Sequence, residues 1–282
     1  MPVSPIRLSL GAALLASLAL AGCGGGSTNT NYSGSTVTGQ VLMGANSPVN
    51  GNGTNNVCAY AIVNGQGNPL TTTVTPYTSY GTVLDCVPSA ANGSFSMNLT
   101  SFYGPVLLQV VGGTYSYNGA SQALNSLTST ALNLAASASN AALATNASLQ
   151  AMVNVGGGGT VTANITPLTT FAVARITPNS GLTLANYTAS LQDIAGQFGL
   201  GGLALATEVP TAGDAYDKAL IGVDQYLLNM GTTLGTTDDP YGANLLNWTN
   251  LGSATTAGTV SADYSTAYNQ ANGTTGVSFN FN

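Results

Sequence analysis

The hydrophobic pattern of this chain changes period once, near residue 165. From Thr36 to about Ile165, short β-branched segments alternate apolar and polar residues and are separated by Gly, Asn and Pro, as half-buried strands are. After Thr166, apolar residues recur every three or four positions, which is the period of an amphipathic helix. The sequence therefore predicts an α+β fold, with an N-terminal antiparallel β-sandwich over 36–165 and a small α-helical module over 166–250.

The predicted elements follow from this pattern and from local start and stop signals. The clearest strands share β-branched or aromatic residues and a flanking turn: 36–43, 56–63, 81–87, 93–99, 105–111 and 161–165. The Ala-rich stretch 130–152 has a helical composition, but its Asn and Ser residues do not favour a helix, and we predict strands for most of it. Three helices are expected over 166–178, 184–198 and 214–231, with a fourth, shorter one near Pro240. The last segment, 251–282, is predicted to be a polar tail with a terminal strand at 277–281.

The N-terminus has the pattern of an export signal, in which Arg7 is followed by an apolar run over 8–20 and by the small residues Ala21 and Gly22. A membrane-spanning helix needs about 20 apolar residues, so the run is too short to be one. Leu20-Ala21-Gly22-Cys23 resembles the lipobox of bacterial lipoproteins, which implies cleavage before Cys23 and acylation of that cysteine. An ordinary signal peptide with a chance cysteine at its end is the alternative.

We therefore expect a signal peptide over 1–22 and a lipidated, flexible tether over 23–35, where the chain is almost entirely Gly, Ser, Thr and Asn. Gly24 in place of Asp resembles the enterobacterial sorting pattern that directs lipoproteins to the outer membrane. The expected location is the outer membrane, at its periplasmic face or at the cell surface. The membrane would be contacted through lipid on Cys23.

Two cysteines, Cys58 and Cys86, remain after Cys23. An exported protein meets an oxidising compartment, where a lone pair of cysteines usually forms a disulfide. A zinc site is the alternative, but two thiolates in a chain without histidine are a poor ligand set for zinc. The sequence predicts a disulfide and no metal or cofactor site.

Charged residues make up only 4% of the chain, and two cations, Arg175 and Lys218, remain beyond the signal segment against nine acids. Nucleic-acid binding needs clustered cations that displace counterions, so a nucleic-acid partner is excluded. With few groups to titrate, stability should change little with pH, which motivates the hypothesis of an acidic habitat.

No arrangement of residues points to catalysis. The chain has no histidine, so the usual general base of serine and cysteine hydrolases is missing. Ala215 stands three residues before Lys218, where a Ser-x-x-Lys acyltransferase would need serine. The acids of the helical region, Glu208, Asp214, Asp217 and Asp224, could supply a carboxylate pair, but Asp214 and Asp217 fall where acids complement a helix dipole. We predict that the chain is not an enzyme.

Three short segments carry a resemblance to a known family. They are Val37-Thr38-Gly39-Gln40-Val41, Asn92-Gly93-Ser94-Phe95-Ser96-Met97 and Val106-Leu107-Leu108-Gln109-Val110. Together they resemble the carboxypeptidase-regulatory-like, prealbumin-type β-sandwich. The run from Asn164 to Ala174, NITPLTTFAVA, is similar to a segment of proteobacterial surface lipoproteins of unassigned activity that follows their regulatory-like domain. Both resemblances imply an architecture rather than a chemistry.

Tyrosines concentrate in the predicted turns of the sandwich, among Ser, Thr, Asn and Gly, and this composition is typical of binding loops on rigid β scaffolds. The candidate binding surface comprises Tyr77, Tyr80, Tyr103, Tyr115 and Tyr117. An uncharged glycan or a protein would suit it, although the rings could simply cover the ends of the sandwich. The sequence thus favours a membrane-anchored surface lipoprotein that acts as a non-catalytic binding or adhesion module. A structural component of an envelope assembly is the alternative, and a hydrolase with an atypical site is the weakest candidate.

Overall fold

The computed structural model describes these residues: 35–62, 79–80, 83–99, 102–110, 112–117, 120–123, 141–142, 149–156, 158–179, 181–229 and 254–281. The predicted signal peptide, Cys23 and most of the predicted tether lie outside them, as does the helix expected near Pro240. Among the described helices, none is both long enough and apolar enough to cross a membrane.

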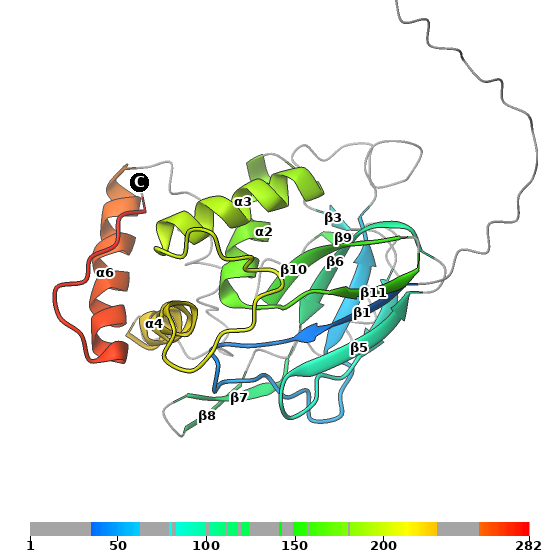
Figure 1. Ribbon diagram of the computed structural model, residues 1–282, viewed down its shortest axis with the longest axis horizontal. Helices are drawn as coiled ribbons and strands as arrows, with labels where there is room; N and C mark the ends of the chain where they lie inside the picture. Colours follow the sequence, from blue (N-terminus) through cyan, green and yellow to red (C-terminus); the bar gives the residue numbers. More distant parts are fainter. Residues whose placement is uncertain are drawn as a thin grey trace, which may run out of the picture. The chain divides into compact units, whose positions relative to one another are not determined.

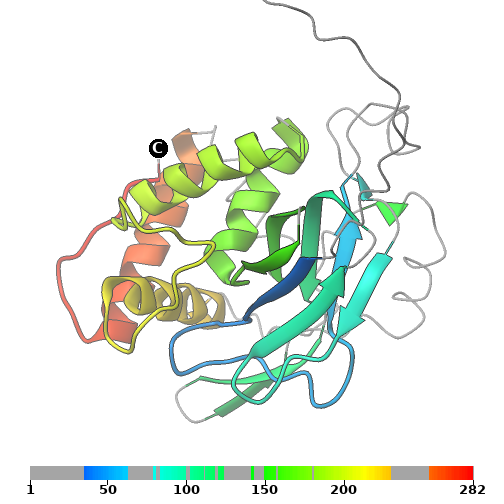
Figure 2. The same cartoon turned by 45° about the vertical axis from the view of Figure 1, so that its right-hand side comes forward.

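The strands form two principal sheets, which Figures 1 and 2 show from two directions. The three-stranded sheet has the order β11-β1-β5, from β1 (Ser35–Gln40), β5 (Ser94–Leu99) and β11 (Gly159–Thr162). The four-stranded sheet has the order β10-β6-β2-β4, from β2 (Val57–Ala61), β4 (Val83–Val87), β6 (Gly104–Val110) and β10 (Leu149–Val155). Two short pairs complete the set: β3 (Ser79–Tyr80) with β9 (Ala141–Ala142), and β7 (Thr114–Tyr117) with β8 (Ala120–Ala123).

All of these pairings are antiparallel except one. β1 pairs with β11 in parallel, over Ser35↔Gly159 to Thr38↔Thr162, so the first and last strands of the β part lie side by side. A parallel neighbour requires a long crossover connection, and here almost the whole β part is that connection.

The disulfide expected from the sequence is confirmed. Cys58 on β2 and Cys86 on β4 are direct cross-strand partners, with an S–S distance of 2.05 Å. The disulfide therefore links the edge strand β4 covalently to its neighbour β2 in the four-stranded sheet.

Four helices are described: α2 (Pro167–Asn179), α3 (Leu184–Gln197), α4 (Ala215–Asn229) and α6 (Ala254–Asn272). Local signals set their ends. The Thr183 hydroxyl accepts the Asn186 N–H at the start of α3, and Gly199, with φ 69°, follows its end. At the start of α4, Asp214 Oδ1 accepts the Asp217 N–H at 2.7 Å.

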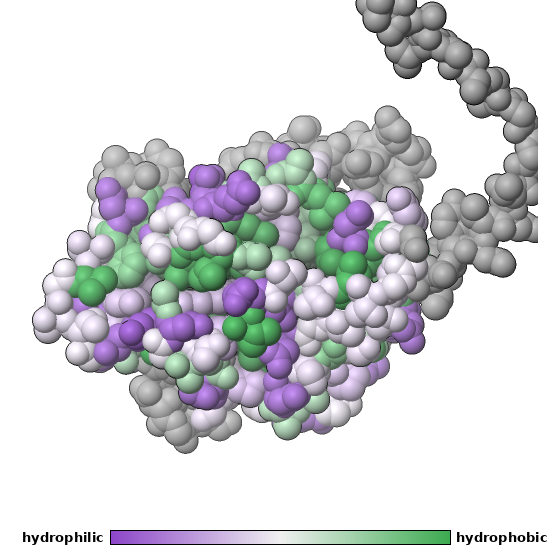
Figure 3. Space-filling view, in the orientation of Figure 1, coloured by the Kyte–Doolittle hydropathy of each residue, from purple (hydrophilic) through white to green (hydrophobic). Residues whose placement is uncertain are grey.

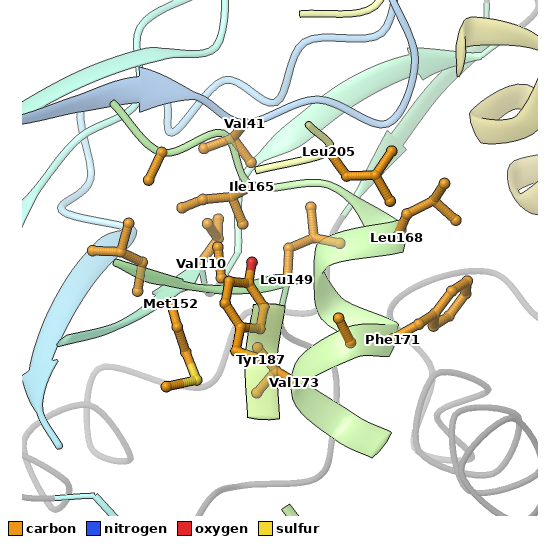
Figure 4. Packing of buried hydrophobic residues seen from close by; sticks show 14 of the residues in the cluster. Val41, Val110, Leu149, Met152, Ile165, Leu168, Phe171, Val173, Tyr187 and Leu205 are labelled. Carbon is orange, nitrogen blue, oxygen red and sulfur yellow. The ribbon is translucent and has the colours of Figure 1, made fainter. Parts of the chain in front are cut away.

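A single hydrophobic core runs through the strands and the helices. Figure 4 shows how residues of β10 and of the segment before α2 point toward α2 and α3, with Met152 and Ile165 near Tyr187. The α+β fold predicted from the sequence is therefore confirmed, with α2 and α3 packed on β10 and α6 packed on α4.

Threonine side chains at the start of α2 hydrogen-bond to the backbone of β10. At the start of α2, the Thr166 and Thr169 hydroxyls each accept the backbone N–H of the other residue. The Thr169 hydroxyl also donates to the Gln150 carbonyl at 2.8 Å, and the Thr170 hydroxyl accepts the Gln150 N–H at 2.8 Å. Threonines of α2 thereby satisfy backbone groups on the open edge of β10, which would otherwise be buried without partners.

The prediction of a polar tail with a terminal strand was wrong. Residues 254–272 form α6, and no strand is present at 277–281, which is extended but lies on the helix instead. Val260, Tyr264 and Ala267 recur at helical spacing and are buried against the rest of the core, but the Ser, Thr and Asn between them gave the segment a loop-like composition. The Phe279 and Phe281 N–H groups donate to the Ser265 and Ser261 hydroxyls of α6, at 2.8 and 3.0 Å.

Candidate binding face

The outer face of the sheet β11-β1-β5 carries only uncharged polar side chains. Val37, Phe95 and Met97 alternate into the core, so the residues between them point the other way. The register aligns the outward residues in rows across the three strands: Thr160–Thr36–Asn98, Thr162–Thr38–Ser96, and then Gln40–Ser94.

These rows form a small lattice of hydroxyl and amide groups. Neighbouring strands lie about 4.8 Å apart, and successive outward residues on a strand about 6.7 Å apart. The Thr36 hydroxyl donates to Asn98 Oδ1 at 2.9 Å. In the part of the chain that the structure describes, the hydroxyls of Thr38, Ser96 and Thr162 have no hydrogen-bond partner, and are therefore available to a ligand.

The second and third rows form the floor of an open depression of about 520 Å³. Its lining contains no charged residue: Thr38, Gly39, Gln40, Pro88, Ser94, Phe95, Ser96, Thr162, Asn164 and Val209. Val209, with 47% of its surface exposed, is an apolar group at its margin. Figure 3 shows the surface over β1, β5 and β11 as mainly pale, the colour of residues of intermediate hydropathy such as Thr, Ser and Gly.

Asn164 fixes the margin of this depression relative to the sheet. Its Oδ1 accepts the Gln40 N–H at 3.0 Å, and its Nδ2 donates to the carbonyls of Thr207 and Glu208 at 3.1 and 2.9 Å. The side chain is almost fully buried. One amide thus joins the end of β1 to the loop that carries Val209.

Gly39 permits the close approach that this arrangement needs. A Cβ atom there would lie only 1.8 Å from the Ala163 carbonyl oxygen. Any other residue would push β1 away from the chain that follows β11, and so would disturb the rows of outward side chains.

The arrangement can bind but offers no activated group for catalysis. Hydroxyls and amides both donate and accept hydrogen bonds, and the lining has neither a general base nor a cation. The described residues also lack any group of three or more His, Cys, Asp or Glu able to hold a metal ion.

The tyrosine hypothesis requires a correction. Tyr115 is 5% exposed and its hydroxyl donates to Asp224 Oδ1 at 2.9 Å, so it is wrong as a member of an exposed binding surface. Its position on β7 turns the ring toward α4. Tyr103 is 68% exposed, beside Gly156. Tyr77 and the side chains of Tyr80 and Tyr117 lie outside the described residues, so the five rings do not establish a shared surface.

The acids of the helical region serve the structure. Asp214 caps α4, and Asp217 accepts the backbone N–H groups of Ala45 and Gly213 at 2.7 and 2.8 Å. The contact of Asp217 with Ala45, which lies 172 positions away in the chain, was not predicted from the sequence. The outward rows were not predicted either, although Thr36-Val37-Thr38 and Thr160-Val161-Thr162 repeat one pattern.

Comparison with known proteins adds little to this description. No family model matches the chain, and no curated protein matches it. The resemblance to carboxypeptidase-regulatory-like domains therefore remains an expectation. A solved structure from Pseudomonas aeruginosa, of a protein proposed to bind carbohydrate, shares 10% identity and covers 48% of this chain and 90% of its own, with a TM-score of 0.22. At that TM-score the likeness carries no argument. What the fold and the face define is an α+β protein with an uncharged, hydroxyl-rich sheet surface.

Proposed function

We propose that this chain is a lipid-anchored, non-catalytic binding protein of the bacterial outer membrane, and that it holds an uncharged, hydroxyl-rich ligand such as a neutral glycan on the outer face of β11-β1-β5. One observation carries the proposal. The hydroxyls of Thr38, Ser96 and Thr162, which have no hydrogen-bond partner among the described residues, lie in or beside a depression whose margin is positioned by the buried Asn164.

The charge of the site selects the class of ligand. An anionic ligand would need cations, and none lines the depression. Of the two cations beyond the signal segment, Arg175 pairs with Asp193 at 3.2 Å on the helices. A neutral sugar presents hydroxyls that both donate and accept, which matches what Thr and Ser present.

The proposed anchor suits a binding role. The tether, 23–35, runs directly into β1, the central strand of the face. Replacing Cys23 with Ser should move the protein from the membrane fraction to the soluble fraction of diderm cells, because the acyl chains supply the membrane affinity. A variant that stays with the membrane would overturn the lipid anchor and leave the binding face untouched.

The face itself is tested by retention of the purified protein on a panel of immobilised neutral and acidic polysaccharides. Thr38→Val and Ser96→Ala together should weaken binding to a neutral polysaccharide about thirtyfold, since each lost hydrogen bond contributes about 1 kcal/mol. Thr188→Val, which changes an exposed threonine on α3, is the matched control and should bind normally. Failure to bind any neutral polysaccharide, or binding that survives the double substitution, would refute the proposal.

A protein ligand is the second candidate, and the exposed Val209 favours it. An apolar group beside a neutral polar surface is a usual feature of protein interfaces. Here Val209→Ser should abolish capture of an envelope protein by cross-linking in intact cells, and the polysaccharide panel should give no retention. That outcome would point to a structural component of an envelope assembly.

A further inference from the structure

The carboxyl group of Asp224 is buried in an unusual environment. The residue lies on α4, is 2% exposed, and receives one hydrogen bond, from the Tyr115 hydroxyl to Oδ1. Its other oxygen, Oδ2, is buried and has no hydrogen-bond partner among the described residues. An ionised carboxylate in such a site would be paired or fully hydrogen-bonded in most proteins, because burying an uncompensated charge is costly.

The surroundings supply no compensating cation. The loop 44–50 and β7 contribute two ionisable groups, the hydroxyls of Tyr115 and Tyr117, and the side chain of Tyr117 lies outside the described residues. On α4, Asp217 and Lys218 lie in the first two turns. From α6 come Asp263, Tyr264, which donates to the Ala219 carbonyl, and Tyr268, and α4 also carries Tyr226. On α2, Arg175 is engaged by Asp193 of α3.

Burial raises the pKa of Asp224 to about 7, and the hydrogen bond from Tyr115 opposes the rise. The carboxyl group therefore changes its protonation state in the neutral range, whereas an exposed aspartate does so near pH 4.

The hydrogen bond between Tyr115 and Asp224 joins the hairpin β7–β8 to α4. β7 is tied to the loop 44–50 by two backbone hydrogen bonds between Asn50 and Thr114, and by the Ser47 hydroxyl, which donates to the Ser116 carbonyl. Tyr115, between them, reaches α4. The hairpin β7–β8 thus meets the helix through a hydrogen bond to a titratable group.

We propose that Asp224 and Tyr115 form a pH-sensitive latch, in which protonated Asp224 holds the hairpin β7–β8 on α4 and loss of that proton weakens the contact. The neutral acid can stay in the dry site with one donor on Oδ1. The carboxylate is less stable there, and separation of the hairpin from α4 admits water to both of its oxygens. The latch is closed in mildly acidic surroundings and loosens above neutrality.

Hydrogen exchange on the full chain tests the latch directly. Protection factors for residues 112–117, corrected for intrinsic exchange, should fall at least tenfold between pH 5.5 and pH 8.5 in the wild type. Asp224→Asn keeps the size and the acceptor of the side chain without a titrating proton, so its protection should not depend on pH. Asp217→Asn is the matched control on the same helix and should keep the wild-type pH dependence.

A second measurement does not depend on the variants folding. Carbon NMR of the Asp224 carboxyl in the wild type should show a titration midpoint near 7, and Tyr115→Phe should raise that midpoint further because the ionised form loses its only donor. A midpoint below 5, or pH-dependent protection that persists in Asp224→Asn, would overturn the latch.

Discussion

Asp217 and Asp224 lie two turns apart on one face of α4, and each fastens the helix to the β part in a different chemical way. Asp217 accepts two backbone N–H groups, from Ala45 and Gly213, with its two oxygens. Asp224 receives one hydroxyl, from Tyr115. Because Oδ2 of Asp224 is buried without a donor among the described residues, its site favours the neutral acid.

This difference predicts how stability depends on pH. The pKa of Asp224 is raised in the folded state to about 7 from 3.8. The folded state therefore loses stability relative to the unfolded chain as pH rises from about 4 through 7, and the loss approaches about 4 kcal/mol at most. Asp224→Asn should remove that loss, so that the variant is more stable than the wild type at pH 8 and the two converge near pH 4. Chemical denaturation at both pH values measures it, and equal stabilities at pH 8 would contradict the prediction.

The disulfide should contribute substantially to stability. It closes a loop of 28 residues, for which the chain-entropy model gives about 3.5 kcal/mol. Replacing both Cys58 and Cys86 with Ser should lower the free energy of unfolding by about that amount. Reduction of the wild type should have a similar effect, which separates loss of the bond from the effect of the two serines. A loss below about 1 kcal/mol would show that the pairing of β2 with β4 already confines the segment in the unfolded ensemble.

Much of the fold was predictable because its signals are local. Alternation predicted the strands near β1, β5 and β6, and the cap residue Asp214 and the terminating glycine Gly199 predicted two helix ends. The helix α6 was missed because its buried positions are few and lie among Ser, Thr and Asn.

The candidate site could not be found in the same way. Its rows depend on the parallel pairing of β1 with β11, whose partners are more than a hundred residues apart, and no local pattern specifies such a register. Tyr115 shows the same dependence on distant residues. The turn-like composition around it predicted an exposed ring, but its contact with Asp224 on α4 buries it.

Asn164 should be important for both stability and binding. Asn164→Ala removes three hydrogen bonds and leaves the Gln40 N–H and the Thr207 and Glu208 carbonyls without this partner. We expect a loss of about 2–3 kcal/mol in the free energy of unfolding, together with weaker retention on a neutral polysaccharide. Asn98→Ala removes an exposed acceptor from the same sheet and should cost less than 1 kcal/mol. Equal effects of the two substitutions would contradict the role assigned to Asn164.

The C-terminal segment should act as an aromatic strap that completes the packing of the helices. Phe281 is 1% exposed, and its ring centroid lies 5.2 Å from that of Phe198 and 5.4 Å from that of Tyr264. Phe281→Ala should therefore lower the free energy of unfolding by about 3 kcal/mol, the usual cost of truncating a buried aromatic residue.

The strap prediction is checked by denaturation together with near-ultraviolet circular dichroism, which reports the packing of Tyr264 and its neighbours. Ser278→Ala changes an exposed residue of the same segment and should leave both measurements unchanged. If Phe281→Ala keeps the stability of the wild type, the segment is held mainly by the hydrogen bonds that Ser261 and Ser265 accept, and the aromatic contacts are secondary. Because those hydroxyls accept backbone N–H groups, replacing both serines with Ala would then cause the larger loss.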